Sequence, residues 1–114
     1  MDKINVLGTE YTIIYKNSKD DSYLEECGGY IDSSVKLIII DDMEACKDEA
    51  LCKSDLKYVQ KHSVRHEIIH AFLFESGLDG CSGGVSNWAA NEEMVDFFAH
   101  QWQKINKAFE SAGV

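Results

Sequence analysis

The N-terminal third of the chain alternates between short apolar runs and polar turns, a pattern typical of β-strands. Ile4–Leu7 and Glu10–Tyr15 flank Gly8 and Thr9, which predicts a β-hairpin. After further polar turns, Val35–Ile40 forms a nearly continuous run of β-branched residues. Such a run predicts a strand that is buried on both of its faces.

The middle of the chain changes to the spacing of an amphipathic helix. Apolar residues recur there at helical intervals, namely Leu56, Val59, Val64, Ile68, Ile69, Phe72 and Leu73. Ser54 or Asp55 can cap the start of this helix, and Gly77 is expected to end it. The acidic stretch 41–54 before the helix predicts a loop with a short helix of its own.

A second amphipathic helix is predicted over residues 88–109, with Ser86 or Asn87 as its N-cap. Its apolar face consists of Met94, Val95, Phe98, Trp102, Ile105 and Phe109. The loop 76–87, which contains several glycines, joins the two helices. We expect a single α+β domain over residues 1–114, in which a small mixed sheet of three or four strands packs against both helices.

Composition narrows the range of partners. With 114 residues, of which 45% are hydrophobic, the chain can build one small core. The formal charge of −9 argues against a nucleic-acid partner, because a phosphate-binding surface needs clustered Lys and Arg. The basic stripe of Lys57, Lys61 and Arg65 is expected to be the solvated face of the first helix. The sequence has no signal-like segment and no apolar run of membrane-spanning length, so we expect a cytoplasmic location and no membrane partner.

The four cysteines, Cys27, Cys46, Cys52 and Cys81, allow two interpretations. An even number is compatible with disulfides. Reduced thiols are expected instead, because the cytosol keeps cysteines reduced. No C-x-x-C pair occurs, which argues against a cysteine zinc site, although Cys81 in the loop between the helices could approach a metal.

The candidate chemistry lies in the first helix, where residues 66–70 read His-Glu-Ile-Ile-His. Residues four apart share a helix face, so the imidazoles of His66 and His70 can reach one zinc ion. Glu67 lies beside that face, where it can take a proton from a metal-bound water. Because two histidines on a helix can also form no more than a half-exposed polar face, the third ligand decides the interpretation.

A catalytic zinc ion takes three protein ligands and keeps one position open. Glu92 and Asp96 in the second helix lie four residues apart and therefore on one face. One carboxylate can bind the metal while the other orients a ligating histidine. Glu92 is favoured over Glu93 as the ligand because it borders the apolar face one turn before Asp96. Alternatively, these acidic side chains only compensate the positive end of the helix dipole. His100 is a minor alternative as the third ligand.

The two helices together resemble a known group of enzymes. H-E-x-x-H followed after a loop by N-E-x-x-x-D resembles the pattern of the gluzincin metallopeptidases. The string E-x-x-V-D-x-F-A at residues 92–99 also resembles a segment of the ImmA/IrrE family, small zinc-peptidase domains associated with phages, mobile elements and stress regulators. The resemblance covers residues 64–99, with Val95 where that family usually has Ala.

This resemblance implies a zincin-like fold and zinc as the cofactor. It implies that the zinc ligands are His66, His70 and Glu92, that the general base is Glu67, and that Asp96 orients a ligating histidine. No His or Tyr matches a family motif for stabilising the oxyanion. The candidates for that role are Tyr30, His62 and His100.

These features favour a zinc-dependent peptidase that hydrolyses a peptide bond of a protein partner, with Glu67 as general base on a zinc-bound water. The resemblance implies a regulator, such as a phage-type repressor, as the substrate. The peptide is expected to lie extended along an exposed strand edge. The alternatives are a non-catalytic, zinc-containing binding or regulatory module and, less favoured, a scaffold without metal.

Overall fold

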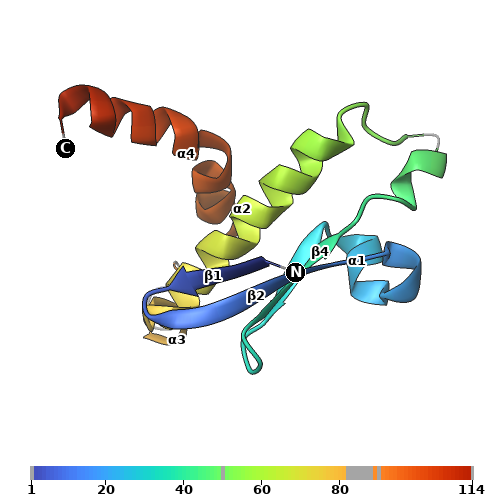
Figure 1. Cartoon of the computed structure of the whole chain (residues 1–114), viewed down its shortest axis with the longest axis horizontal. Helices are drawn as coiled ribbons and strands as arrows, with labels where there is room; N and C mark the ends of the chain where they lie inside the picture. Colours follow the sequence, from blue (N-terminus) through green and yellow to red (C-terminus); the bar gives the residue numbers. More distant parts are fainter. Residues whose placement is uncertain (1, 50, 82–88, 90, 114) are drawn as a thin grey trace.

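The computed structural model describes residues 2–49, 51–81, 89 and 91–113. It is a mixed α+β domain built on a four-stranded sheet of order β1-β2-β4-β3 (Figure 1). The strands are β1 (Asp2–Val6), β2 (Thr9–Lys16), β3 (Gly29–Asp32) and β4 (Leu37–Asp41). β2 and β4 are parallel, whereas the outer pairs are antiparallel, so β1 and β3 form the two edges. The predicted α+β class with a small mixed sheet is confirmed.

Two long helices, α2 (Leu56–Glu75) and α4 (Glu92–Ala112), pack against each other, and α2 also packs against the sheet. The shorter helices are α1 (Ser22–Glu26), α3 (Leu78–Cys81) and the 3₁₀ turns η1 (Ser18–Asp20) and η2 (Cys46–Asp48). Figure 1 shows α4 crossing α2 and then leading away from the sheet. α2 therefore lies between the sheet and α4, so the prediction that the sheet packs against both helices is right for α2 and wrong for α4, which packs on α2 instead.

The predicted β-hairpin forms, but its turn lies one residue earlier than expected. Val6 pairs with Thr9, which leaves Leu7 and Gly8 as the two turn residues. Both have positive φ angles, 51° and 91° respectively. Two-residue hairpin turns favour this left-handed backbone because it matches the twist of the strands, and glycine adopts it without strain.

The β-branched run predicted to be buried on both faces is confirmed as the inner strand β4. Ile38, Ile39 and Ile40 are at most 1% exposed. Val35 lies in the turn before the strand and is exposed, so β4 begins two residues later than the run suggests. The residues that form the core beneath α2 are Val6, Tyr11, Ile13, Ile38, Ile40 and Ala71, and those packed against them are Ile4, Ile31, Val64 and Ile68.

α2 begins and ends where the sequence predicts. The side chain of Asp55 caps the helix by accepting a hydrogen bond of 2.9 Å from the backbone N–H of Tyr58. Beyond the end of the helix, Gly77 has a φ of 81°, a left-handed conformation typical of helix ends. The basic stripe is only partly solvated, because Arg65 is half-buried and its Nε donates to the carbonyl of Ala99 at 2.8 Å. Arg65 therefore ties α4 to α2.

The start of the second helix was predicted too early. α4 begins at Glu92 because Asn91 caps it, its side-chain oxygen accepting from the backbone N–H of Met94 at 2.9 Å. The predicted caps Ser86 and Asn87 lie outside the described residues. Although the helix packs on α2 through buried residues such as Val95, Trp102 on the predicted apolar face is 43% exposed.

Candidate metal centre

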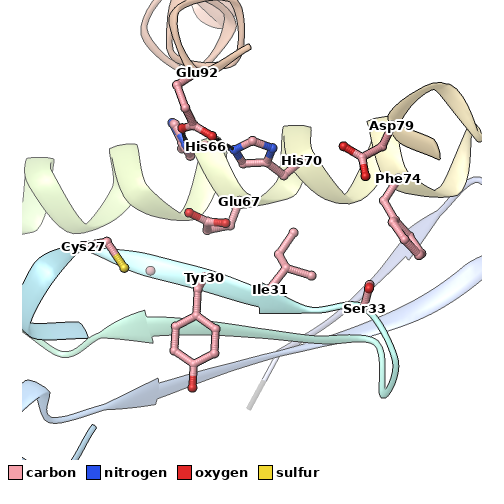
Figure 2. Close-up of a pocket in the computed structure, with 11 residues that line it drawn as sticks. Cys27, Tyr30, Ile31, Ser33, His66, Glu67, His70, Phe74, Asp79 and Glu92 are labelled. Atoms are coloured by element: carbon pink, nitrogen blue, oxygen red, sulfur yellow. Dashed lines mark hydrogen bonds and ion pairs between the residues drawn. The ribbon is translucent and has the colours of Figure 1, made fainter. Parts of the chain in front are cut away.

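α2 presents the two histidines of the motif side by side. His66 and His70 lie one turn apart, and their Nε2 atoms are 3.2 Å from each other. Their side chains are mostly covered, with 18% and 22% exposed. Burial lowers the pKa of His70, which favours the neutral imidazole that a metal ion requires. The predicted pairing of these imidazoles on one helix face is therefore present in the fold (Figure 2).

Glu92 reaches this pair from the first turn of α4. Its Oε2 lies 2.9 Å from Nε2 of His66, and its Oε1 lies 3.0 Å from Nε2 of His70. Four ligands at about 2.0–2.1 Å from a tetrahedral zinc ion lie about 3.3 Å from one another. The two imidazole nitrogens, 3.2 Å apart, are close to that value. Glu92 contacts them through different oxygens, so its carboxylate would have to turn to place one oxygen as a ligand beside both nitrogens. Glu93, which is not favoured as a metal ligand, is exposed.

Asp96 lies one helical turn beyond Glu92 and contacts the far side of the His66 ring. Its Oδ1 is 3.3 Å from Nδ1 of His66 and 2.7 Å from Nε2 of His62. These hydrogen bonds, with His62 as the largest contribution, lower the pKa of Asp96 below its ordinary value. A carboxylate on Nδ1 fixes the tautomer that leaves the Nε2 lone pair free for a metal. Asp96 therefore lies where it can orient the His66 ring, and this role stays a prediction.

Glu67 lies beneath the two histidines, facing the sheet. The residue is only 8% exposed. Burial raises the pKa of Glu67 to about 7, and the nearby Glu92 carboxylate acts in the same direction, while His66 opposes it. A carboxyl group with a pKa near the working pH is suited to accepting and returning a proton.

A cleft of about 410 Å³ opens between the histidines and the edge strand β3. The side chains that line it include Ile31 and Phe74, while Glu67 and the metal-ligand candidates form one wall (Figure 2). Because β3 pairs only with β4 among the described strands, its other edge is unpaired, and residues of this strand line the cleft. The arrangement places an open strand edge next to the candidate metal centre.

None of the three candidate oxyanion helpers extends a polar group into the cleft. Figure 2 shows the Tyr30 side chain directed away from the histidines. Its hydroxyl donates to Asp21 at 2.7 Å, which raises the pKa of Tyr30 to about 12. His62 instead contacts Asp96 at 2.7 Å, and His100 contacts the same carboxylate at 3.4 Å. The sequence does not choose among these three candidates and favours a surface or packing role for each, and their contacts with Asp21 and Asp96 agree with such a role.

The described cysteines, Cys27, Cys46 and Cys52, form no disulfide in the structure, although two of them lie close together. Cys27 lines the cleft, while the sulfur atoms of Cys46 and Cys52 are 2.6 Å apart before the start of α2. The side chain of Cys81 lies outside the described residues, so the possibility that it approaches a metal stays a prediction.

Sequence reasoning missed the contribution of the adjacent glycines at the start of β3, Gly28 and Gly29. A Cβ atom at Gly28 would lie 2.5 Å from Oγ of Ser63, and one at Gly29 would lie 3.2 Å from Cγ of Glu67. Both positions therefore allow the strand to approach α2 closely. Adjacent glycines at the start of a strand signal such an approach, but they do not say which helix is approached.

Comparison with protein-family models, curated proteins and solved structures gives no significant match. In the part of the chain that the structure describes, no helix combines the length and apolar character needed to cross a membrane. The inference about function therefore depends on the geometry of the site itself.

Proposed function

We propose that this chain is a zinc-dependent peptidase with a reduced zincin-like fold. The observation that carries the proposal is the convergence of His66, His70 and Glu92, whose ligand atoms lie within 4.8 Å of one another. Two of these ligands come from α2 and one from α4, as the gluzincin resemblance implies. The buried carboxyl group of Glu67 lies beside them and faces the cleft.

The donor set fits zinc, because two imidazole nitrogens and one carboxylate oxygen are a common catalytic combination that leaves a coordination position open. When bound there, zinc would polarise the scissile carbonyl and make a coordinated water more acidic. Glu67 accepts the proton of the attacking water and passes it to the departing amine. Asp96 holds the His66 ring, so that its Nε2 stays directed at the site.

The edge of β3 is suited to hold the substrate. An extended peptide can add to an exposed strand through backbone hydrogen bonds, while its side chains enter neighbouring pockets. Ile31 and Phe74 give the cleft apolar surface beside the catalytic groups. A peptide bound to β3 would pass Glu67, because Gly29 at the start of this strand approaches that residue closely.

The substrate that we favour is a partner protein, such as a phage-type repressor or another regulator. This part of the proposal rests on the ImmA/IrrE resemblance of residues 92–99. The open edge of β3 supports an extended segment of a protein as the bound form, since such an edge pairs with backbone of any sequence. Side-chain selectivity would then come from the pocket formed by Ile31 and Phe74.

One observation favours a second candidate, a non-catalytic zinc-containing regulatory module. Peptide hydrolysis benefits from a group that stabilises the oxyanion. Tyr30, His62 and His100 are each engaged elsewhere, with Asp21 or with Asp96. In that case the metal centre would bind a partner without cleaving it.

The decisive experiment combines metal analysis with proteolysis. Purified protein should hold about one zinc ion per chain by elemental analysis after mild dialysis. Incubation with a candidate regulator should give fragments with wild-type protein and none with the Glu67→Gln variant. Absence of transition metal, with no uptake on adding zinc, would exclude the peptidase. Bound zinc without cleavage of any partner or casein would favour the binding module.

A further inference from the structure

A second group of histidines lies directly behind the metal centre. His62, one turn before His66 on α2, places its Nε2 atom 2.7 Å from Oδ1 of Asp96. His100 approaches the other oxygen of that carboxylate at 3.4 Å. The rings of His62 and His100 lie 4.0 Å apart between centroids. Together with His66, whose Nδ1 also contacts Asp96, three histidines surround this carboxylate. Either a second metal ion or a hydrogen-bond network can explain the arrangement.

The buried nitrogen of His62 distinguishes these explanations. Nδ1 of His62 is buried and has no hydrogen-bond partner in the described structure. If Nε2 bound a metal, the ring proton would have to lie on Nδ1, leaving a buried donor without an acceptor. If Nε2 carries the proton and donates it to Asp96, only a lone pair at Nδ1 remains unpaired, which is better tolerated. The tautomer with a protonated Nε2 is therefore favoured.

The distance supports the same conclusion. The 2.7 Å between Nε2 of His62 and Oδ1 of Asp96 is typical of a hydrogen bond between N–H and a carboxylate. The group formed by His62, Asp96 and His100 thus acts through hydrogen bonds.

We propose that His62 is a positioning residue for the metal centre, holding the Asp96 carboxylate on Nδ1 of His66; this proposal rests on the zinc site described above. The Asp96 side chain is 44% exposed and comes from α4, so without a restraint its carboxylate can rotate toward solvent. The His62 side chain is only 18% exposed and lies on α2, the same helix as His66. It therefore couples the orienting carboxylate to the helix that carries the ligand.

His100 contributes less to this restraint. It lies on α4 with Asp96, its contact is longer at 3.4 Å, and its side chain is 45% exposed. Because both residues lie on α4, the contact of His100 with Asp96 cannot couple that carboxylate to α2. His62 is the residue of this group that can do so through a short contact.

Two amide substitutions test the proposal. His62→Gln places an N–H donor near the position of Nε2, whereas His62→Asn has the same chemistry but is one bond shorter and does not reach Asp96. We expect His62→Asn to weaken zinc binding by about 10–100-fold, as is typical when a partner of a ligating histidine is lost. His62→Gln should stay within about threefold of wild type. Zinc affinity is measured by competition with a chromophoric chelator, after circular dichroism has shown that both variants are folded.

The pathway through Asp96 is tested in the same assay. In an Asp96→Ala background, neither His62 substitution should cause further loss, because the residue through which His62 acts is gone. Further loss in that background would overturn the proposal, as would wild-type affinity in His62→Asn. Should His62→Asn be unfolded, His62→Gln must still match wild type, and a large loss there would refute the hydrogen-bond role.

Metal stoichiometry separates the remaining outcomes. Wild-type protein that binds two zinc ions, with only one left in His62→Gln, would show that this group is a second metal site. If wild type binds zinc and hydrolyses its substrate but His62→Asn has the same zinc affinity, the role of His62 is refuted and the proposed function is not. Wild-type protein that binds no zinc would refute the proposed function and this inference together.

Discussion

Replacing Glu67 with Gln removes the charge of a buried carboxylate while keeping the size and shape of the side chain. Burial raises the pKa of Glu67 to about 7 from an ordinary value of 4.5. Below pH 4.5 the group is protonated in both the folded and the unfolded chain, so its titration costs no stability. Between these pH values the unfolded chain ionises first, and the free energy of unfolding falls as pH rises.

The size of this effect follows from the difference in pKa. Above pH 7 it amounts to about 3 kcal/mol of lost stability, at 1.36 kcal/mol for each pKa step. Glu67→Gln does not titrate and escapes this loss. We therefore expect the difference in unfolding free energy between the variant and wild type to increase by about 2–3 kcal/mol, in favour of the variant, as the pH rises from 5 to 8. The free energies are measured by urea unfolding in the presence of a chelator. Glu93→Gln, which removes an exposed carboxylate, serves as the charge control.

The same variant should lose hydrolysis while keeping its metal. A missing general base typically reduces the rate by about 10²–10⁴-fold, whereas His66 and His70 are untouched and should still bind zinc. If the unfolding free energies of wild type and Glu67→Gln change in parallel with pH, the pKa of Glu67 is not raised in the folded chain. Loss of zinc from Glu67→Gln would show that the residue is not mainly a base.

The other predictions concern the third ligand, the close strand and the thiols. Glu92→Ala should weaken zinc binding by orders of magnitude and Glu93→Ala should change it little, as chelator competition would show; equal small effects would exclude Glu92 as a ligand. Gly29→Ala should destabilise the fold by about 1–3 kcal/mol in urea unfolding, because a Cβ atom there would lie 2.9 Å from a backbone oxygen; unchanged stability would contradict this packing. Cys46 and Cys52, with sulfurs 2.6 Å apart, should form a disulfide with each other when treated with oxidised glutathione, which is reduced in the exchange. Alkylation and mass spectrometry would show the loss of both thiols together. A glutathione adduct on one cysteine alone would contradict this prediction.

Features set by local pattern could be predicted from the sequence. The run ending at Ile40 is apolar at consecutive positions, and this requires cover on both faces wherever the strand lies. The spacing of His66 and His70 fixes their relative position, because both lie on one continuous helix. The cap could be narrowed to Ser54 or Asp55 for the same reason, since capping involves only the next turn, and the structure has Asp55 in that role.

Features that depend on packing between distant segments were harder to predict. The position of Glu92 opposite the histidines was inferred from its spacing to Asp96 and from a resemblance, while the packing of α4 on α2 was not visible in the sequence. The sequence offers His62 only as one of three undecided candidates for an oxyanion helper, because it does not show that Asp96 lies 2.7 Å from this histidine. Arg65 was assigned to solvent because its acceptor, the carbonyl of Ala99, comes from another helix.

The burial of Glu67 bears on the choice between a peptidase and a non-catalytic module. Its neighbours on the sheet-facing side of α2 include Ile68 and Ala71, so an apolar residue at position 67 would fit that surface and avoid the cost of a buried carboxyl group. A structural zinc site is usually closed by four protein ligands and needs no such carboxyl group. A hydrolytic site, in contrast, needs an open ligand position and a proton acceptor of suitable pKa. The described residues offer three converging ligand atoms, a cleft and a carboxyl group with a pKa of about 7, the combination that hydrolysis requires.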